Sequence, residues 1–186
     1  GSASRGERRR AAIITIAVVP AARDVPLGEF AAALTAALSR LGRAPHLTSE
    51  IVDRRCGRPG VAQAHDRDGG GTGLIEWLAE QELDDQYLVY EADRGLSPWT
   101  ERCIRQADRV VLVADASGDA APGEVESELL RAPTTAAPVT LALLHARDAG
   151  APSGTSRWLG RAIERHLHVR RGAASDYDRV AGFLTG

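Results

Sequence analysis

The sequence predicts an α/β domain in which a mostly parallel β-sheet is covered by helices on both faces. Short, nearly continuous apolar runs alternate with longer segments whose apolar residues recur at helical spacing. This alternation is typical of parallel strands joined by right-handed crossovers. Because the runs lack the alternating polar positions of a half-exposed strand, we expect a sheet buried on both sides. A Rossmann-like domain fits this pattern, and so does a three-layer, P-loop-like domain whose phosphate loop has degenerated.

The first half of the chain predicts strand–helix units. The β-branched run at residues 13–19 suits a buried strand, and residues 27–41 repeat leucine and phenylalanine at helical spacing before Gly42, a residue suited to a helix C-terminus. Residues 56–73 have the least regular pattern. The other elements expected in this half are a strand at 45–49, a helix at 50–55, a helix at 74–82 and a strand at 87–93.

Residues 96–115, LSPWTERCIRQADRVVLVAD, form the clearest helix–strand unit. Ser97 suits an N-cap, Pro98 suits a first helical turn, and Glu101 lies near the positive end of the helix dipole. The apolar strand that follows ends on Asp115. The elements expected after it are a helix at 123–132, a strand at 138–145, a helix at 156–166, a strand at 167–169 and a helix at 175–185.

The composition excludes several kinds of chemistry. All 23 basic residues are arginine, which rules out both a Schiff-base lysine and the lysine of a phosphate-binding loop. Since Cys56 and Cys103 are the only cysteines, neither a disulfide framework nor a four-cysteine zinc site can form, and we expect a cytoplasmic protein. The net charge of −2 gives no general attraction to nucleic acid. No apolar run approaches the ~18 residues of a transmembrane segment.

The length of 186 residues suits a single α/β domain over residues 13–186. Residues 1–12 are expected to be a tail, in which Gly1-Ser2 resembles the remnant of a cleaved tag and Arg8–Arg10 belongs to a solvated basic cluster. Because the chain does not begin with methionine, we expect it to be a piece of a larger protein.

Two acids define a candidate ligand site. Ligands of open parallel sheets bind beyond the carboxyl ends of the strands, and Asp93 and Asp115 stand at two such ends. One hypothesis is that both acids bind a nucleotide through magnesium. The alternative is that they form turns and caps. The loop PAARDVPLGEF, residues 20–30, lacks the glycines and the lysine of a phosphate-binding loop, which favours the alternative, and we expect no cofactor.

Other motifs give weaker indications. The glycine stretch at 68–73 follows no strong strand, and the chain has no GxSxG elbow for it to partner, so it is interpreted as a flexible loop. His166 and His168 would share one face of a strand, but a zinc site needs three or four ligands. Cys103 lies on the apolar side of its helix, which favours a buried thiol over a nucleophile.

An interaction surface is a further hypothesis. Trp99 lies in the first turn of its helix, near a strand end, and with Arg102 on the same helix it is the candidate contact surface for a partner. A homodimer formed through exposed helices is one form that such a contact would take.

Several segments together resemble a known family. IAVVPAARDVPLGEFAAALTAALSRLG, HLTSEIV, GLIEWLAEQE and above all LSPWTERCIRQADRVVLVAD are similar to the segment that precedes the patatin-type catalytic domain in the neuropathy target esterase family. GEVESELL, TLALLH and DYDRVAGFLTG continue the resemblance in the same order, from about Ile13 to the end of the chain. The loop from Arg58 to Gly73 departs from the family pattern.

The resemblance implies a parent protein that is a patatin-type phospholipase or lysophospholipase. In that family, cyclic-nucleotide-binding-like domains precede this segment and a serine–aspartate hydrolase domain follows it. No residue of this chain matches the serine–aspartate dyad, so the resemblance implies a non-catalytic coupling domain whose partners are those neighbouring domains. The parent is then a serine hydrolase associated with membranes. Two alternatives stay open: a nucleotide-binding or weakly NTP-hydrolysing module that uses Asp93 and Asp115, and a dimerisation domain.

Overall fold

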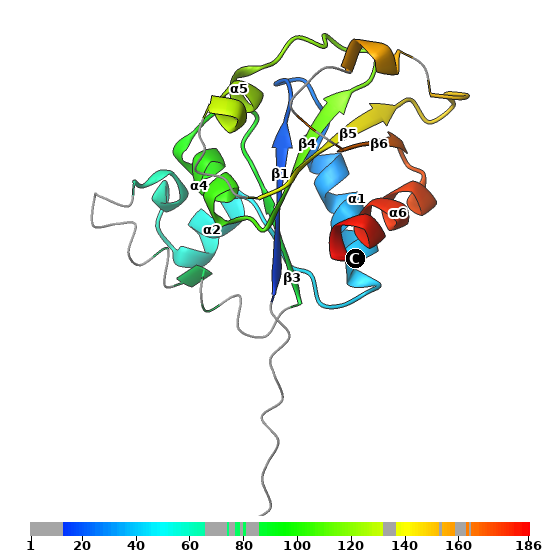
Figure 1. Ribbon diagram of the computed structural model, residues 1–186. Coiled ribbons are helices and arrows are strands. Elements are labelled where there is room, and N and C mark those ends of the chain that lie inside the picture. Colours follow the sequence, from blue (N-terminus) through cyan, green and yellow to red (C-terminus); the bar gives the residue numbers. More distant parts are fainter. Residues whose placement is uncertain are drawn as a thin grey trace, which may run out of the picture.

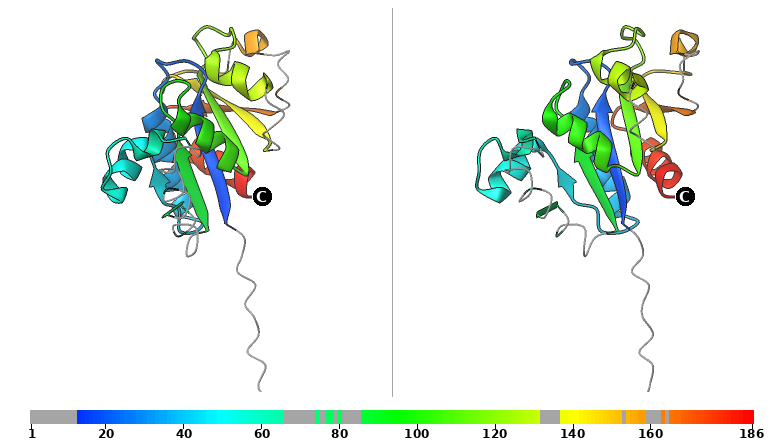
Figure 2. Two further views of the ribbon diagram at one scale, coloured as in Figure 1. Left: turned by 90° about the vertical axis from the view of Figure 1, so that its left-hand side faces the viewer. Right: turned by 60° about the vertical axis from the view of Figure 1, so that its left-hand side comes forward.

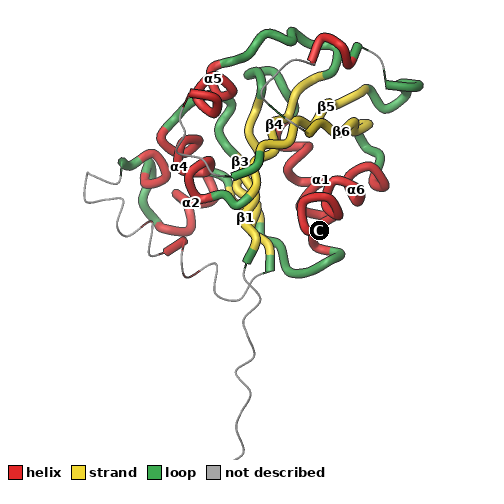
Figure 3. The backbone as a smooth tube through the Cα atoms, in the orientation of Figure 1, coloured by secondary structure: helices red, strands yellow, loops and turns green. Residues whose placement is uncertain are grey.

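Parallel strands form the centre of the molecule in the order β2-β3-β1-β4-β5-β6 (Figures 1 and 3). The strands are β1 (Ile14–Pro20), β2 (His46–Leu47), β3 (Tyr87–Glu91), β4 (Arg109–Asp115), β5 (Val139–His145) and β6 (Arg165–Arg170). The computed structural model describes residues 13–65, 74, 77–78, 80, 86–131, 137–152, 154–158, 163 and 165–186. Within this part of the chain every strand pairing is parallel, which confirms the predicted α/β class.

Helices cover both faces of the sheet, so the domain has three layers (Figures 1 and 2). α1 (Leu27–Ser39) and α6 (Ala174–Thr185) lie on one face. The other face is covered by α2 (Ser49–Cys56), α4 (Pro98–Gln106), α5 (Glu124–Arg131) and the short 3-10 turns η1 (Val61–Gln63) and η3 (Thr155–Trp158). Leu74, Trp77, Leu78 and Glu80, which belong to the helix predicted at 74–82, are helical.

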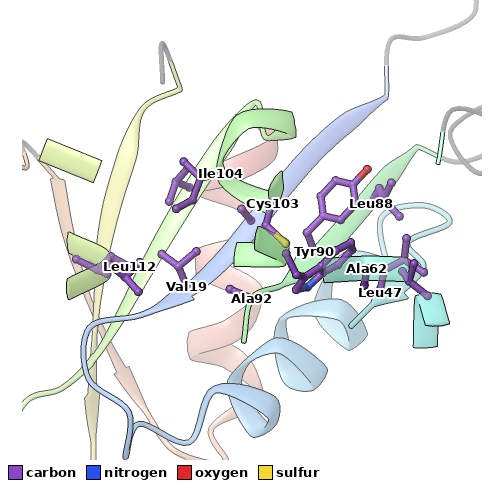
Figure 4. Packing of buried hydrophobic residues seen from close by; sticks show 14 of the residues in the cluster. Val19, Leu47, Ala62, Leu88, Tyr90, Ala92, Cys103, Ile104 and Leu112 are labelled. Carbon is purple, nitrogen blue, oxygen red and sulfur yellow. The ribbon is translucent and has the colours of Figure 1, made fainter. Parts of the chain in front are cut away.

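The buried strands supply side chains to two separate cores. In β1, Ile16 and Val18 pack beneath α1 and α6, whereas Ala17 and Val19 face the opposite helices. All four side chains are fully buried, because successive residues of a strand point to opposite faces. Figure 4 shows the second core, where Cys103 of α4 points toward the sheet. Burial on both faces explains why the central strands β1, β4 and β5 are apolar almost without interruption.

The helix boundaries follow from local chemistry. Ser97 caps α4, because its hydroxyl oxygen accepts a hydrogen bond from the backbone N–H of Thr100 at 3.1 Å, as the sequence predicts. Thr48 caps α2, because its hydroxyl oxygen accepts from the N–H of Ile51 at 3.1 Å. The predicted helix at 27–41 ends at Ser39.

The last strand is longer than the sequence predicts. The pattern indicated a helix over 156–166 and a strand over 167–169, yet Arg165 and His166 are part of β6 and stand opposite Thr140 and Leu141 of β5. A charged edge strand has no periodic apolar face, so pairing with the neighbouring strand decided its structure. Residues 159–162 and 164, which share that predicted helix, lie outside the described residues.

Candidate functional site at the carboxyl edge of the sheet

The carboxyl ends of the strands meet at one edge, where the loops after β1, β3, β4 and β5 come together. β1 lies between β3 and β4. The chain runs from β1 toward the β2 side of the sheet and from β4 toward the β6 side, which makes this edge a topological switch point. Open parallel sheets bind their ligands at such points, so the side chains gathered here form the candidate site.

The loop after β1 is held by its neighbours. The N–H of Ala21 donates to the carbonyl of Val113 at 2.8 Å, and Val25 is buried. Gly123, just before α5, lies so close to the Ala21 carbonyl that a Cβ atom there would clash with it. The glycine therefore allows the loops after β1 and β4 to pack directly on each other.

An ion-paired clasp links three of the loops. The guanidinium of Arg23, in the loop after β1, donates to the carboxylate of Glu124 at 2.9 Å. The same carboxylate oxygen accepts from the N–H of Leu96, in the loop after β3, at 3.1 Å. Gly95 packs against both side chains, and a Cβ atom in its place would clash with them. Glu124 thus joins the loops after β1 and β3 to the beginning of α5.

Carboxylates surround the N-terminal end of α1. A hollow of about 520 Å³ lies there, and its lining includes Glu29, Glu50, Glu91, Asp93 and Arg94. A carboxylate oxygen of Glu91 lies 3.8 Å from the place that a Cβ atom would take on Gly28, in the first turn of α1. The positive end of the helix dipole is the feature that binds phosphate in P-loop proteins. Here acidic side chains lie beside it.

Asp93 is the acceptor for three side chains from separate segments. Its carboxylate accepts from the hydroxyl of Ser49 at 2.7 Å, the amide of Gln63 at 2.8 Å and the hydroxyl of Ser97 at 2.6 Å. Its backbone N–H donates to the hydroxyl of Thr100 at 3.1 Å. The carboxylate therefore connects the start of α2, the turn η1 and the start of α4.

Asp115 lies at the same edge but does not meet Asp93. It ends β4, is exposed, and accepts from the N–H and the hydroxyl of Ser117 at 2.9 and 2.7 Å, which makes a local turn. β1 separates its strand from β3, so the two strands are roughly 10 Å apart. No group of three or more His, Cys, Asp or Glu side chains in the described part of the chain could hold a metal ion.

Trp99 and Arg102 are buried, which corrects the hypothesis that they form a contact surface. Trp99 has no exposed surface, and its indole N–H donates to the carbonyl of Glu91 at 2.8 Å. Its ring stands edge-on to Tyr90, with 6.0 Å between the centroids. Arg102 is 2% exposed and donates to the carbonyl of Ala64 at 3.0 Å. The sequence placed Trp99 near the surface because the partners that bury it come from distant segments.

The cysteine and histidine predictions can also be compared with the structure. Cys103 is buried, as the sequence predicts, and burial raises the pKa of its thiol well above the usual range. His168 lies next to His145, with 2.8 Å between Nδ1 and Nε2, and the ring of His166 stands edge-on to it. Burial, followed by the nearby charges of His145, His166 and Arg179, lowers the pKa of His168. The glycine stretch at 68–73 lies outside the described residues.

Comparison with known sequences identifies the family. The model of the neuropathy target esterase family P-loop like domain matches residues 12–186. The chain belongs to this family.

Relatives of this neuropathy target esterase family domain are much longer proteins. The chain is 38% identical over 157 residues to patatin-like phospholipase domain-containing protein 7 of Mus musculus, which covers 83% of the chain and 11% of the relative. It is 31% identical over 160 residues to the human patatin-like phospholipase domain-containing protein 6, and this match covers 85% of the chain and 11% of the relative. It is 38% identical over 159 residues to lysophospholipase NTE1 of Cryptococcus neoformans, and this match covers 83% of the chain and 9% of the relative. The chain thus spans about a tenth of these relatives.

Solved structures share the fold of the domain at low sequence identity. A plasmid partition protein from Borrelia burgdorferi has a TM-score of 0.65 and 11% identity, and the match covers 93% of this chain and 98% of that one. A plasmid partition protein from the same organism bound to AMPPNP has a TM-score of 0.61 and 11% identity over 93% and 98%. Cobyrinic acid a,c-diamide synthase from Mycobacterium smegmatis has a TM-score of 0.63 and 15% identity over 92% and 94%. At such identities only the fold is shared.

The family's description as P-loop like agrees with the geometry at the edge of the sheet. Residues 20–26 run from β1 to α1 as a phosphate loop would, yet the chain has no lysine to serve one. Sequence reasoning identified this departure but missed Glu91 and Glu124, which it treated as ordinary strand and helix residues. Among the described residues, no helix has both the length and the apolar character needed to cross a membrane.

Proposed function

We propose that this chain is a non-catalytic coupling domain of a patatin-type phospholipase or lysophospholipase. It joins cyclic-nucleotide-binding-like domains to the serine hydrolase domain of one polypeptide, in the cytoplasm, in a parent protein associated with membranes. Its partners are those two neighbours, and it binds no nucleic acid. The names of the relatives support the hydrolase part of this proposal.

One observation carries the coupling role. The place that binds phosphate in P-loop proteins holds carboxylates here, and polar side chains tie the surrounding loops together. Asp93 uses its oxygens to hold α2, η1 and α4, while Glu124 holds the loops after β1 and β3. Side chains bound in this way maintain the relative positions of loops, which is what a domain needs in order to pass a displacement from one neighbour to another.

The proposal is tested first on the isolated domain. Incubated with lysophosphatidylcholine, the purified 186-residue chain should release no fatty acid above the buffer rate. Hydrolysis that purifies with the folded domain would contradict a non-catalytic role.

The coupling itself is tested in the intact parent protein. We expect the hydrolysis rate to respond when the cyclic-nucleotide-binding-like domains are removed, and this response should shrink in a Glu124→Gln variant, whose side chain forms no ion pair with Arg23. Asp119→Asn is the matched control, because it removes one exposed charge close to the same loops outside the clasp. An unchanged response in Glu124→Gln would count against coupling through the clasp.

Nucleotide binding is the second candidate function, because one protein of the same fold was solved with AMPPNP. In this alternative Asp93 and Asp115 hold the magnesium of a bound nucleotide. A thermal-shift titration with ATP, GTP and cyclic nucleotides, with and without magnesium, decides between the two. A ligand at one hundred times its dissociation constant stabilises the folded state by ~2.7 kcal/mol, or roughly 5–11 °C for a domain of this size. Such a shift, lost in Asp115→Asn, would favour the alternative.

A further inference from the structure

Exposed arginines gather at the end of α2 and in the turn after it. Arg54 and Arg55 lie in the last turn of α2, and Arg58 follows two residues after its end. All three side chains are exposed, and none forms a hydrogen bond or ion pair with another residue that the structure describes. We call Arg54, Arg55 and Arg58 the arginine turn. The arginine turn differs in this respect from Arg23, Arg40 and Arg171, whose guanidinium groups form ion pairs with carboxylates.

The backbone holds the arginine turn in a fixed shape. Gly57 and Gly60 have φ values of 65° and 80°, a left-handed conformation that other residues rarely adopt. The carboxylate of Asp53 accepts from the N–H of Gly60 at 2.9 Å and from that of Ala62 at 2.8 Å. The carboxylate of Asp53 is therefore used within the turn, and the three arginine side chains remain exposed.

The position of the arginine turn suits a broad surface better than a pocket. Figures 1 and 2 show α2 at the rim of the molecule, on the side away from α6. The three arginines do not line the hollow at the N-terminal end of α1, whereas Glu50, at the other end of α2, does. The charge is thus displayed at a projecting corner of the domain.

We propose that the arginine turn docks on a lipid bilayer that contains anionic phospholipids. Guanidinium groups bind phosphate oxygens in pairs and keep their charge in any environment. Each arginine near an anionic bilayer contributes about fivefold to partitioning, or ~1 kcal/mol. The lipid is chosen because the relatives are named as phospholipases, so this inference rests on the proposed function. A docked domain would hold the hydrolase close to its substrate surface.

The test is sedimentation of the full 186-residue chain with phosphatidylcholine vesicles containing phosphatidylserine. Changing all three arginines to glutamine, R54Q/R55Q/R58Q, should lower the partition coefficient roughly 100-fold, whereas R54K/R55K/R58K should keep most of it because the charge remains. Binding should also weaken steeply between 0.1 and 1 M salt, as the Debye length falls from about 10 to 3 Å. The three side chains form no hydrogen bond or ion pair with the described part of the chain, and Arg54 and Arg55 lose only their interaction with the C-terminal end of the α2 dipole, so a melting temperature within a few degrees of the unmutated chain shows that the variants are folded.

A second variant separates the arginine turn from the basic tail. R8Q/R9Q/R10Q removes the same amount of charge and should leave most vesicle binding intact. Three results would each overturn the proposal. The first is equal vesicle binding by the unmutated chain and R54Q/R55Q/R58Q, and the second is equal binding to vesicles of phosphatidylcholine alone. The third is tighter binding of an oligonucleotide through the same arginines. Vesicle binding is measured on this domain alone, without the hydrolase, so an absence of vesicle binding would leave the coupling proposal standing. Conversely, a full-length protein in which coupling fails could still bind vesicles through the arginine turn.

Discussion

Replacing Asp93 by alanine separates a structural carboxylate from a ligand-binding one. In the folded protein this carboxylate accepts hydrogen bonds from Ser49, Gln63 and Ser97, and alanine would leave all three donors without that partner. A hydrogen bond to a charged group contributes about 1.5–3 kcal/mol when buried. Because Asp93 is only partly buried, we take about 1 kcal/mol for each bond and expect a loss of roughly 3 kcal/mol in the free energy of unfolding.

Urea denaturation measured by tryptophan fluorescence tests this value, since a change in the midpoint at constant m reports stability. Asp115→Ala is the matched control: its two hydrogen bonds are local and exposed, so about 0.5–1 kcal/mol should be lost. A carboxylate kept for ligand binding commonly costs stability in the free protein. If Asp93→Ala were as stable as the parent chain, or more stable, the structural reading of Asp93 would be refuted and the nucleotide alternative strengthened.

Three further outcomes follow from burial and charge. Trp99→Ala should cost roughly 3–5 kcal/mol in urea denaturation at any protein concentration, whereas a loss that grows on dilution would point to a partner contact instead. In a thiol-labelling assay of the folded protein, Cys56 should react and Cys103 should not, because Cys103 is buried with a raised pKa; two rapidly reacting thiols would contradict this. The lowered pKa of His168 means that the unfolded state binds its proton more readily, so its contribution is present above pH 6.5 and is lost as pH falls through the folded-state pKa. The stability difference between the parent chain and His168→Gln should change in that direction across pH 7.5–5, and a difference constant with pH would exclude the linkage.

Local features could be predicted from the sequence because neighbouring residues determine them. The central strands β1, β4 and β5 are nearly continuous apolar runs, and Ser97 caps α4 through a residue only three positions away. The contact-surface prediction for Trp99 failed for the opposite reason. Its burial depends on Tyr90 and on the turn η1, which supplies the Gln63 side chain that accepts from the Trp99 N–H, and no pattern within the helix reveals these partners.

The candidate site was predicted only as a location. Strand ends identified the carboxyl edge, and the missing lysine indicated a departure from phosphate binding, but the partners of Asp93 lie between 4 and 44 residues away in the chain. Glu124 reaches Arg23 across 101 residues. An acid at the start of a helix is common for reasons of the dipole alone, so the sequence contains no signal that distinguishes Glu124 as a clasp.

The charges at the edge weigh against a phosphate at the N-terminal end of α1. A carboxylate and a phosphate charge roughly 5 Å apart repel by about 3 kcal/mol at an effective dielectric constant of 20. Glu29 and Glu91 both line this end of the helix, but Arg171 pairs with Glu29 and His46 pairs with Glu91, so their combined opposition to a phosphate is smaller than twice that value. A magnesium ion could offset this repulsion, but on Asp93 it would compete with Ser49, Gln63 and Ser97 for the carboxylate oxygens. Of the two acids that would serve a nucleotide, Asp93 is therefore already used to hold separate segments together, and this favours a domain that transmits movement over one that binds nucleotide.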